Sequence, residues 1–225
     1  EVYIFVNDEI EMAGKIRVGT RVYSKGTFTD PDLKGYTPIV ALAKSSPYGS
    51  LSPYLLKTSN GILLENYYQF SKVYERVPKS VQRRNQYDNT VIWDHPAETH
   101  CDERGQPNLK YFRWRRKGMA VRDPVRWPVG KAFSNRCLFS ILEDDIETRL
   151  SYVEARKQIY FRSYLEAVEK EDQFKELQDR LAGEENLLII EVDGPHQESL
   201  GYYVDTYEYR ISFSNIRLFK LRKRI

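Results

Sequence analysis

The sequence predicts an α+β fold, with one compact domain at residues 37–225 and a β-rich leader at residues 1–36. Of the 225 residues, 41% are hydrophobic, which is enough to build a core of domain size. Patterns typical of strands occupy the leader, and apolar residues at helical spacing occupy residues 148–182. Because an apolar run at 187–192 then has the character of a buried strand, helices and strands are mixed along the chain.

The leader contains two strand patterns. Val2–Val6 is a short apolar run, and Lys15–Tyr23 alternates charged with apolar residues. The domain begins with another apolar run at 37–44, followed by a loop rich in serine, glycine and proline. A turn signal at Asn60-Gly61 separates this loop region from the helix that we expect next.

The expected helix extends toward Pro78 and carries a polar stripe. Glu65, Gln69 and Lys72 are separated by four and three residues, which places all three on one face of a single helix. The positions around them are apolar or aromatic: Ile62, Leu63, Leu64, Tyr67, Tyr68, Phe70, Val73 and Tyr74. Such a stripe indicates a pocket or a buried network. The alternative is a partly exposed helix with an internal Glu–Lys pair.

A basic block at 110–136 follows a polar, irregular stretch at 79–110. It carries nine lysines and arginines, one acid and several aromatic residues. Arginines interleaved with aromatic rings can pair with phosphates and stack on bases. The candidate contacts to phosphate or nucleic acid are Arg113, Arg115, Arg116 and Lys117. The alternative is that the acidic segment from Glu143 onward lies against this block.

The last predicted elements are a helix pair at 148–182 and a strand at 187–192. Phe174, Leu177 and Leu181 mark the buried side of the second helix, which we expect to end at Gly183. Asp193 follows the strand, just before a Gly-Pro turn. Carboxylates at such strand ends often take part in catalysis or binding, although aspartates that only form the turn are more common.

Composition excludes several classes of protein. Two cysteines, Cys101 and Cys137, form no disulfide framework and have no metal-ligand spacing, so we expect no metal site and no cofactor. No stretch approaches the run of about 18 apolar residues that a membrane span needs. We therefore expect an intracellular protein of the cytoplasm or nucleus that does not enter a membrane. A net charge of +3 identifies no partner by itself.

The segment 45–74 resembles the NADAR family, whose members cleave N-glycosidic bonds. The resemblance rests on a serine-, glycine- and aromatic-rich loop, then a glycine, then a glutamate with glutamine and lysine four and seven positions later. In this chain those positions are Ser50, Ser52, Tyr54, Gly61, Glu65, Gln69 and Lys72. The resemblance extends more loosely over residues 37–200. The chain departs from the family pattern after Asp193, where the usual Trp-Gly-x-Gly is absent.

The resemblance implies a NADAR-like hydrolase acting on a phosphorylated riboside, such as an ADP-ribosylated base or a riboflavin-pathway intermediate. Glu65 would be the acid/base or ring-stabilising carboxylate and Lys72 the nucleophile, through a Schiff base with the opened sugar. Asp193 would be a second catalytic carboxylate.

The substrate contacts implied or proposed on the same basis are Gln69 as an orienting group, Ser50 and Ser52 on ribose or phosphate, Trp93 stacked on the base, and Arg126 on the phosphate. The alternative is a non-catalytic nucleic-acid-binding or scaffold protein that retains the fold. The basic tail at residues 211–225, which holds Arg217, Lys220, Arg222, Lys223 and Arg224, and the absent Trp-Gly-x-Gly favour this alternative. The three polar groups at 65, 69 and 72 favour the enzyme.

Overall fold

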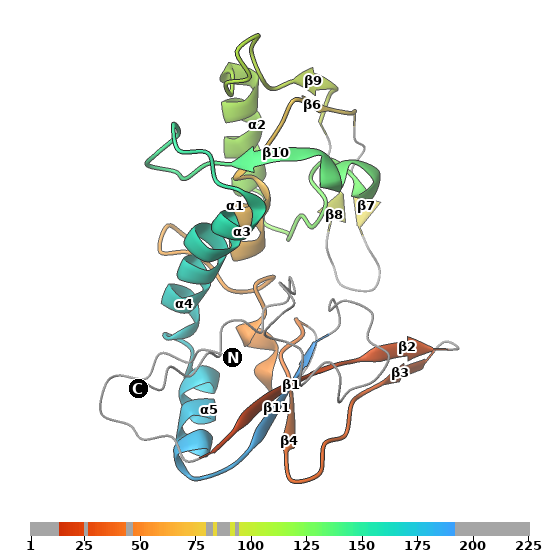
Figure 1. Cartoon of the computed structure of the whole chain (residues 1–225), viewed down its shortest axis with the longest axis vertical. Coiled ribbons are helices and arrows are strands. Elements are labelled where there is room, and N and C mark those ends of the chain that lie inside the picture. The colour runs from red at the N-terminus through yellow and green to blue at the C-terminus, as the bar shows by residue number, and fades with distance from the viewer. Residues whose placement is uncertain are drawn as a thin grey trace. The chain divides into compact units, whose positions relative to one another are not determined.

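The computed structural model describes residues 14–24, 27–43, 47–79, 83–84, 91–92 and 95–191. Helices and strands are mixed in it, which confirms the α+β class (Figure 1). The chain divides into two compact units, one made of Glu1–Ser52 with Val168–Ile225 and the other of Pro53–Ala167. The strand expected at 2–6, together with Trp93 and Asp193, lies outside the described residues.

The first unit is built on a three-stranded parallel sheet. Strand β11 (Leu187–Glu191) lies at its centre, between β1 (Ile16–Thr20) and β4 (Thr37–Val40). Leu187 to Ile190 are all nearly inaccessible to solvent, as expected of a parallel strand covered on both faces. This arrangement explains the unbroken apolar run in the sequence and confirms the predicted strand.

The remaining elements of the first unit are short, apart from one helix. Strands β2 (Val22–Ser24) and β3 (Thr27–Thr29) form an antiparallel hairpin, and η1 (Tyr48–Leu51) is a 3₁₀ turn. Helix α5 (Asp172–Ala182) buries Phe174, Leu177 and Leu181, the side predicted from their spacing, and is capped by Gly183.

A polar cluster connects three of these elements. Arg180 of α5 donates to both carboxylate oxygens of Glu185, at 2.7 and 2.6 Å, and Thr37 of β4 donates to the same carboxylate at 2.6 Å. Arg180 also contacts the hydroxyl of Tyr48 on η1. The hydrogen bonds from Arg180 and then Thr37 lower the pKa of Glu185 to about 2.

The second unit contains short antiparallel strand pairs and the remaining helices. The pairs are β5 (Lys72–Tyr74) with β10 (Cys137–Ser140), β6 (Arg76–Val77) with β9 (Glu98–Thr99), and β7 (Arg83–Arg84) with β8 (Val91–Ile92). The helical elements are α1 (Leu64–Gln69), α2 (Leu109–Met119), the 3₁₀ helix η2 (Lys131–Arg136), α3 (Tyr152–Ala155), the π-helical turn η3 (Arg156–Phe161) and α4 (Arg162–Val168). The last three follow one another directly from Tyr152 to Val168, so that, with α5 of the first unit, helical residues occupy most of the segment 148–182.

Two features of this unit differ from the sequence-based expectations. The expected long helix ends at Gln69, and Lys72 is the first residue of β5 rather than a residue of α1. The first part of the basic block is a helix, α2, which the pattern analysis did not predict. The side chain of Asn108 caps it by accepting from the backbone N–H groups of Lys110 and Tyr111.

An aromatic core joins α1, β5 and α2. Phe70, Tyr74, Tyr111 and Trp114 are all buried, and the ring of Phe70 meets that of Trp114 edge-on at 4.7 Å. The hydroxyl of Tyr111 donates to the carbonyl oxygens of Phe70 and Ser71, at 3.3 and 3.1 Å. These contacts hold the chain where it changes from helix α1 to strand β5. Among the described helices, none is both long and apolar enough to cross a bilayer.

Candidate functional site

Glu65, Gln69 and Lys72 form a continuous hydrogen-bonded chain in the second unit. Nε2 of Gln69 donates to Oε1 of Glu65 at 2.8 Å, and Nζ of Lys72 donates to Oε1 of Gln69 at 2.7 Å. Glu65 is buried, while Gln69 and Lys72 are partly buried. The three groups predicted from their spacing therefore lie together, although they do not share one helix.

The local fold explains how Lys72 reaches the chain from a strand. The hydroxyl of Ser71 donates to the carbonyl of Tyr68 at 2.7 Å, and the backbone N–H of Phe70 donates to Asn66, closing the last turn of α1. The chain then continues in β5, where Lys72 pairs with Ser140 of β10. A lysine three residues beyond Gln69 thus remains beside it even though the helix has ended.

Arg156 and two tyrosines complete the surroundings of this chain. Nζ of Lys72 lies 4.5 Å from the ring centroid of Tyr68, and the guanidinium carbon of Arg156 lies 3.9 Å from the ring of Tyr160 and 5.2 Å from that of Tyr68. The two rings meet edge-on at 5.1 Å. Cation–π contacts of this kind stabilise positive charge at a partly dehydrated site.

Arg156 is a site residue that the sequence analysis missed. It is buried on the π-helical turn η3, and turns of this type occur frequently at functional sites. Its signal in the sequence is its place on the apolar face, three residues after Val153 and four before Tyr160, where a charged residue is unexpected.

Burial shifts the pKa values of Glu65 and Lys72, the two ionisable members of this hydrogen-bonded chain, in opposite directions. It raises the pKa of Glu65, an effect that the hydrogen bond from Gln69 and the charge of Lys72 partly offset. It lowers the pKa of Lys72 to about 8, with Cys137 and Glu65 opposing the change. A carboxyl group that keeps its proton more readily and an amine that loses its proton more readily suit a proton donor and a nucleophile.

The other predicted substrate contacts are distributed over both units. Arg126 belongs to the second unit, lies 4.5 Å from the ring of Trp127, and its charge acts on the carboxyl group of Glu65. Ser50 and Ser52 belong to the first unit. The Oγ of Ser50 is buried and has no hydrogen-bond partner among the described residues.

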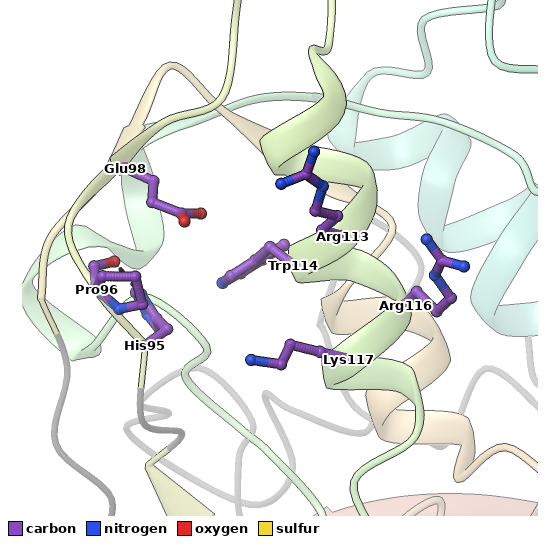
Figure 2. Close-up of a pocket in the computed structure, with 7 residues that line it drawn as sticks. All are labelled: His95, Pro96, Glu98, Arg113, Trp114, Arg116 and Lys117. Carbon is purple, nitrogen blue, oxygen red and sulfur yellow. Dashed lines mark hydrogen bonds between the residues drawn. The ribbon is translucent and has the colours of Figure 1, made fainter.

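The predicted phosphate contacts lie on α2, and they separate into two groups. Arg115 is buried and donates to the carbonyl of Leu142 at 3.2 Å, which removes it from the surface contacts expected from the sequence. Arg113, Arg116 and Lys117 are exposed. They line a cavity of about 360 Å³ beside α2, together with Trp114 of the same helix and with His95, Pro96 and Glu98 across from it (Figure 2).

Over the part of the chain that the structure describes, no three histidine, cysteine, aspartate or glutamate side chains gather as a metal ion would need. Both cysteines are free. Comparison of the chain with protein-family models, with curated proteins and with solved structures gave no match.

Proposed function

We propose that this protein is an N-glycosidase in which Lys72 is the nucleophile and Glu65 the proton donor, acting on a phosphorylated riboside or an ADP-ribosylated base. The single observation that supports it best is the hydrogen-bonded chain from Glu65 through Gln69 to Lys72, set among buried aromatic rings. The resemblance of segment 45–74 to the NADAR family accords with this activity and with a domain of that type.

The chemistry requires three events that these residues can supply. The neutral amine of Lys72 attacks the anomeric carbon as the bond from that carbon to the base nitrogen breaks, and the bonding electrons leave with the base. Glu65 gives its proton to the departing nitrogen. The Lys72 nitrogen then loses one of its two protons as the ring C–O bond opens, the ring oxygen gains one, and a protonated imine forms. Water hydrolyses the imine to the free sugar and restores the amine.

The surrounding charges suit an anionic substrate. Lys72, Arg156 and Arg126 all act on Glu65, so positive groups outnumber the single carboxylate around it. A phosphate would be attracted to this environment, and an arginine can bind it through two hydrogen bonds. A phosphorylated substrate also accords with the intracellular location expected from the sequence.

Reductive trapping tests the proposal directly. The protein is incubated with ADP-ribosylated guanosine, NAD or a ribosyl-aminopyrimidine phosphate, then treated with borohydride, and adducts are located by intact mass and peptide mapping. We expect an adduct on Lys72 that is absent from Lys72→Met and present in Lys57→Met, which changes an exposed lysine of the same unit.

Glu65→Gln provides a second measurement in the same assay. The amide can still accept from Gln69 but cannot give a proton, so base release should fall about 100-fold or more while the fold persists. An equal adduct on Lys72→Met would remove Lys72 from the mechanism. Folded protein that neither forms an adduct nor releases base would favour the non-catalytic alternative.

A further inference from the structure

We propose that the exposed side of α2 and the cavity beside it bind single-stranded nucleic acid. This site is separate from the Glu65–Lys72 chain and does not depend on the activity proposed there. Four observations support it: the charge of α2, the spacing of its cations, the chemistry of the cavity wall, and the size of the cavity.

The charge of α2 is not balanced locally. The helix carries Lys110, Arg113, Arg115, Arg116 and Lys117 and no acidic residue. Arg115 is buried, whereas the other four are exposed and form no ion pair with any residue that the structure describes.

Other helices of the same chain show the opposite behaviour. On α4, Arg162 pairs with Glu166 at 3.2 Å, and on α5, Lys175 pairs with Asp172 at 3.1 Å. Cations on those helices are thus neutralised by a carboxylate one turn away, as is common on solvated helix surfaces. The cations of α2 remain available to an external anion.

The spacing of these cations suits a chain of phosphates better than a single anion. Lys110, Arg113 and Lys117 are three and four residues apart, so they follow one side of the helix. With a rise of 1.5 Å per residue, they extend over about 10 Å. A lone phosphate would use one part of such a line, whereas a nucleic-acid backbone can use all of it.

The cavity wall favours a nucleotide with its base inserted. Arg113 and Lys117 reach toward the cavity from α2, while Glu98 and His95 face them from the opposite side (Figure 2). Both ring nitrogens of His95 lie 2.9 Å from backbone carbonyls, those of Pro96 and Pro128, so this ring forms part of the wall. Glu98 repels phosphate but can accept a hydrogen bond from the N–H group of a base.

The size of the cavity favours single-stranded over double-stranded nucleic acid as the ligand. A volume of about 360 Å³ lies at the lower end of the range for small-molecule sites, which suits one nucleotide unit. A base can enter only when it is not paired, because a paired base remains within its duplex. We therefore infer that the phosphates lie along the α2 cations and that one base enters the cavity toward Glu98.

Fluorescence anisotropy with a labelled single strand of about twelve nucleotides tests this inference. Binding is measured at salt concentrations from about 50 to 200 mM for the full chain and for two doubly substituted variants. Arg113→Gln with Lys117→Gln removes two cavity cations. Lys57→Gln with Lys79→Gln removes the same charge from exposed positions elsewhere in the unit.

The expected result is specific to the first variant. The slope of log affinity against log salt should decrease in magnitude by about 1.4, because each phosphate contact to a single strand contributes about 0.7. Affinity at about 100 mM salt should fall at least tenfold, and the Lys57/Lys79 variant should keep the original slope. A matching duplex should bind more weakly than the single strand.

Three outcomes would overturn the inference. Equal losses in both variants would show that net charge alone drives binding. A duplex bound as tightly as the single strand would exclude base insertion. Displacement of the strand by inorganic phosphate at similar concentrations would indicate a small-anion site. Lys72→Met should bind the strand normally, so failure of the proposed glycosidase and failure of this site give different results.

Discussion

Lys72 has contacts that stabilise its charged form and also a lowered pKa, a combination that is rare among exposed lysines. Its ammonium donates to Gln69 and lies over the ring of Tyr68, yet burial still lowers its pKa to about 8. The charges of Cys137 and Glu65 favour the ammonium form but compensate for only part of the lost hydration. The consequence is an amine that is substantially neutral at mildly alkaline pH, as a nucleophilic lysine needs to be.

The pH dependence of the free energy of unfolding tests the lowered pKa of Lys72 without any substrate. The pKa of Lys72 falls from an ordinary value of 10.5 to about 8 in the folded protein, so between these values the unfolded chain binds more protons. The free energy of unfolding should therefore rise relative to Lys72→Met between pH 8 and 10.5, by a total of roughly 3 kcal/mol.

Urea unfolding at several pH values from 7 to 10 measures this difference, with Lys57→Met as the matched control. The comparison must be between variants, because burial also raises the pKa of Tyr68, Tyr74 and Tyr111, which affects all the proteins equally in this range. A difference that does not change with pH would show that Lys72 keeps an ordinary pKa.

At the residue scale, sequence reasoning found the polar chain but not its surroundings. Offsets of four and three predicted that Glu65, Gln69 and Lys72 lie together, and they do, but through a helix that ends at Gln69 and a strand that begins at Lys72. Local spacing cannot show that Arg156, 84 positions after Lys72, lies over Tyr68 and Tyr160. Such proximity comes from tertiary packing.

At the scale of elements, Gly118 permits the close approach of α2 to the end of α1. A Cβ atom at this position would lie 2.0 Å from a ring carbon of Phe70, which is fully buried. Glycine normally weakens a helix relative to alanine by about 1 kcal/mol, so its presence in α2 reflects packing rather than helix preference.

Gly118→Ala should therefore destabilise the protein although it improves helix propensity. Overpacking of this kind costs about 1–3 kcal/mol, because neither the Phe70 ring nor the helix can move freely. Thermal or urea unfolding measures the change. Arg116→Ala, on the exposed side of the same helix, should change stability little, and adding Phe70→Leu to Gly118→Ala should recover part of the loss. A stabilised Gly118→Ala variant would contradict this packing.

Element prediction succeeded where burial and local pattern agree. The strand at β11 and the buried side of α5 follow directly from their apolar residues. The expected long helix was wrong because Lys72–Tyr74 pairs with Cys137–Ser140, and a partner more than 60 positions away is not visible in a local pattern. Helix α2 was missed because its positive charges obscured its amphipathic spacing.

At the scale of the whole molecule, the acid sensitivity of the first unit depends on Glu185. Its carboxylate holds Arg180 of α5 and Thr37 of β4, and these hydrogen bonds lower its pKa to about 2. A depressed carboxyl pKa stabilises the folded state above the unfolded value, near 4.5, and this contribution is lost as pH falls toward 2.

Glu185→Gln should thus be less stable than the native protein at pH 7, with a difference that shrinks from about pH 4.5 downward and vanishes near pH 2. Because the side chain is about one-third exposed, solvent screening keeps the effect modest. Urea unfolding at pH 7, 4.5 and 3 measures it. Glu184→Gln, an exposed neighbour with the same charge change, should show no such trend.

The α+β class follows from the sequence, but the division of the chain does not. A pattern of apolar residues predicts that β1 and β11 are strands, without showing that Ile16 pairs with Leu187. Pairing between such distant segments is decided by the whole fold, as is the grouping of both chain ends into one unit.

That grouping has a consequence for the order of folding during synthesis. All residues of the second unit, Pro53–Ala167, are translated before β11. The sheet of the first unit lacks its central strand until Leu187–Glu191 has been translated. Strands β1 and β4 therefore have no β11 to pair with while more than 140 further residues are translated. During translation, a chaperone that shields exposed strand edges would therefore have longer to act on β1 and β4 than on the strands of the second unit, where β5 meets β10 after fewer than 70 residues.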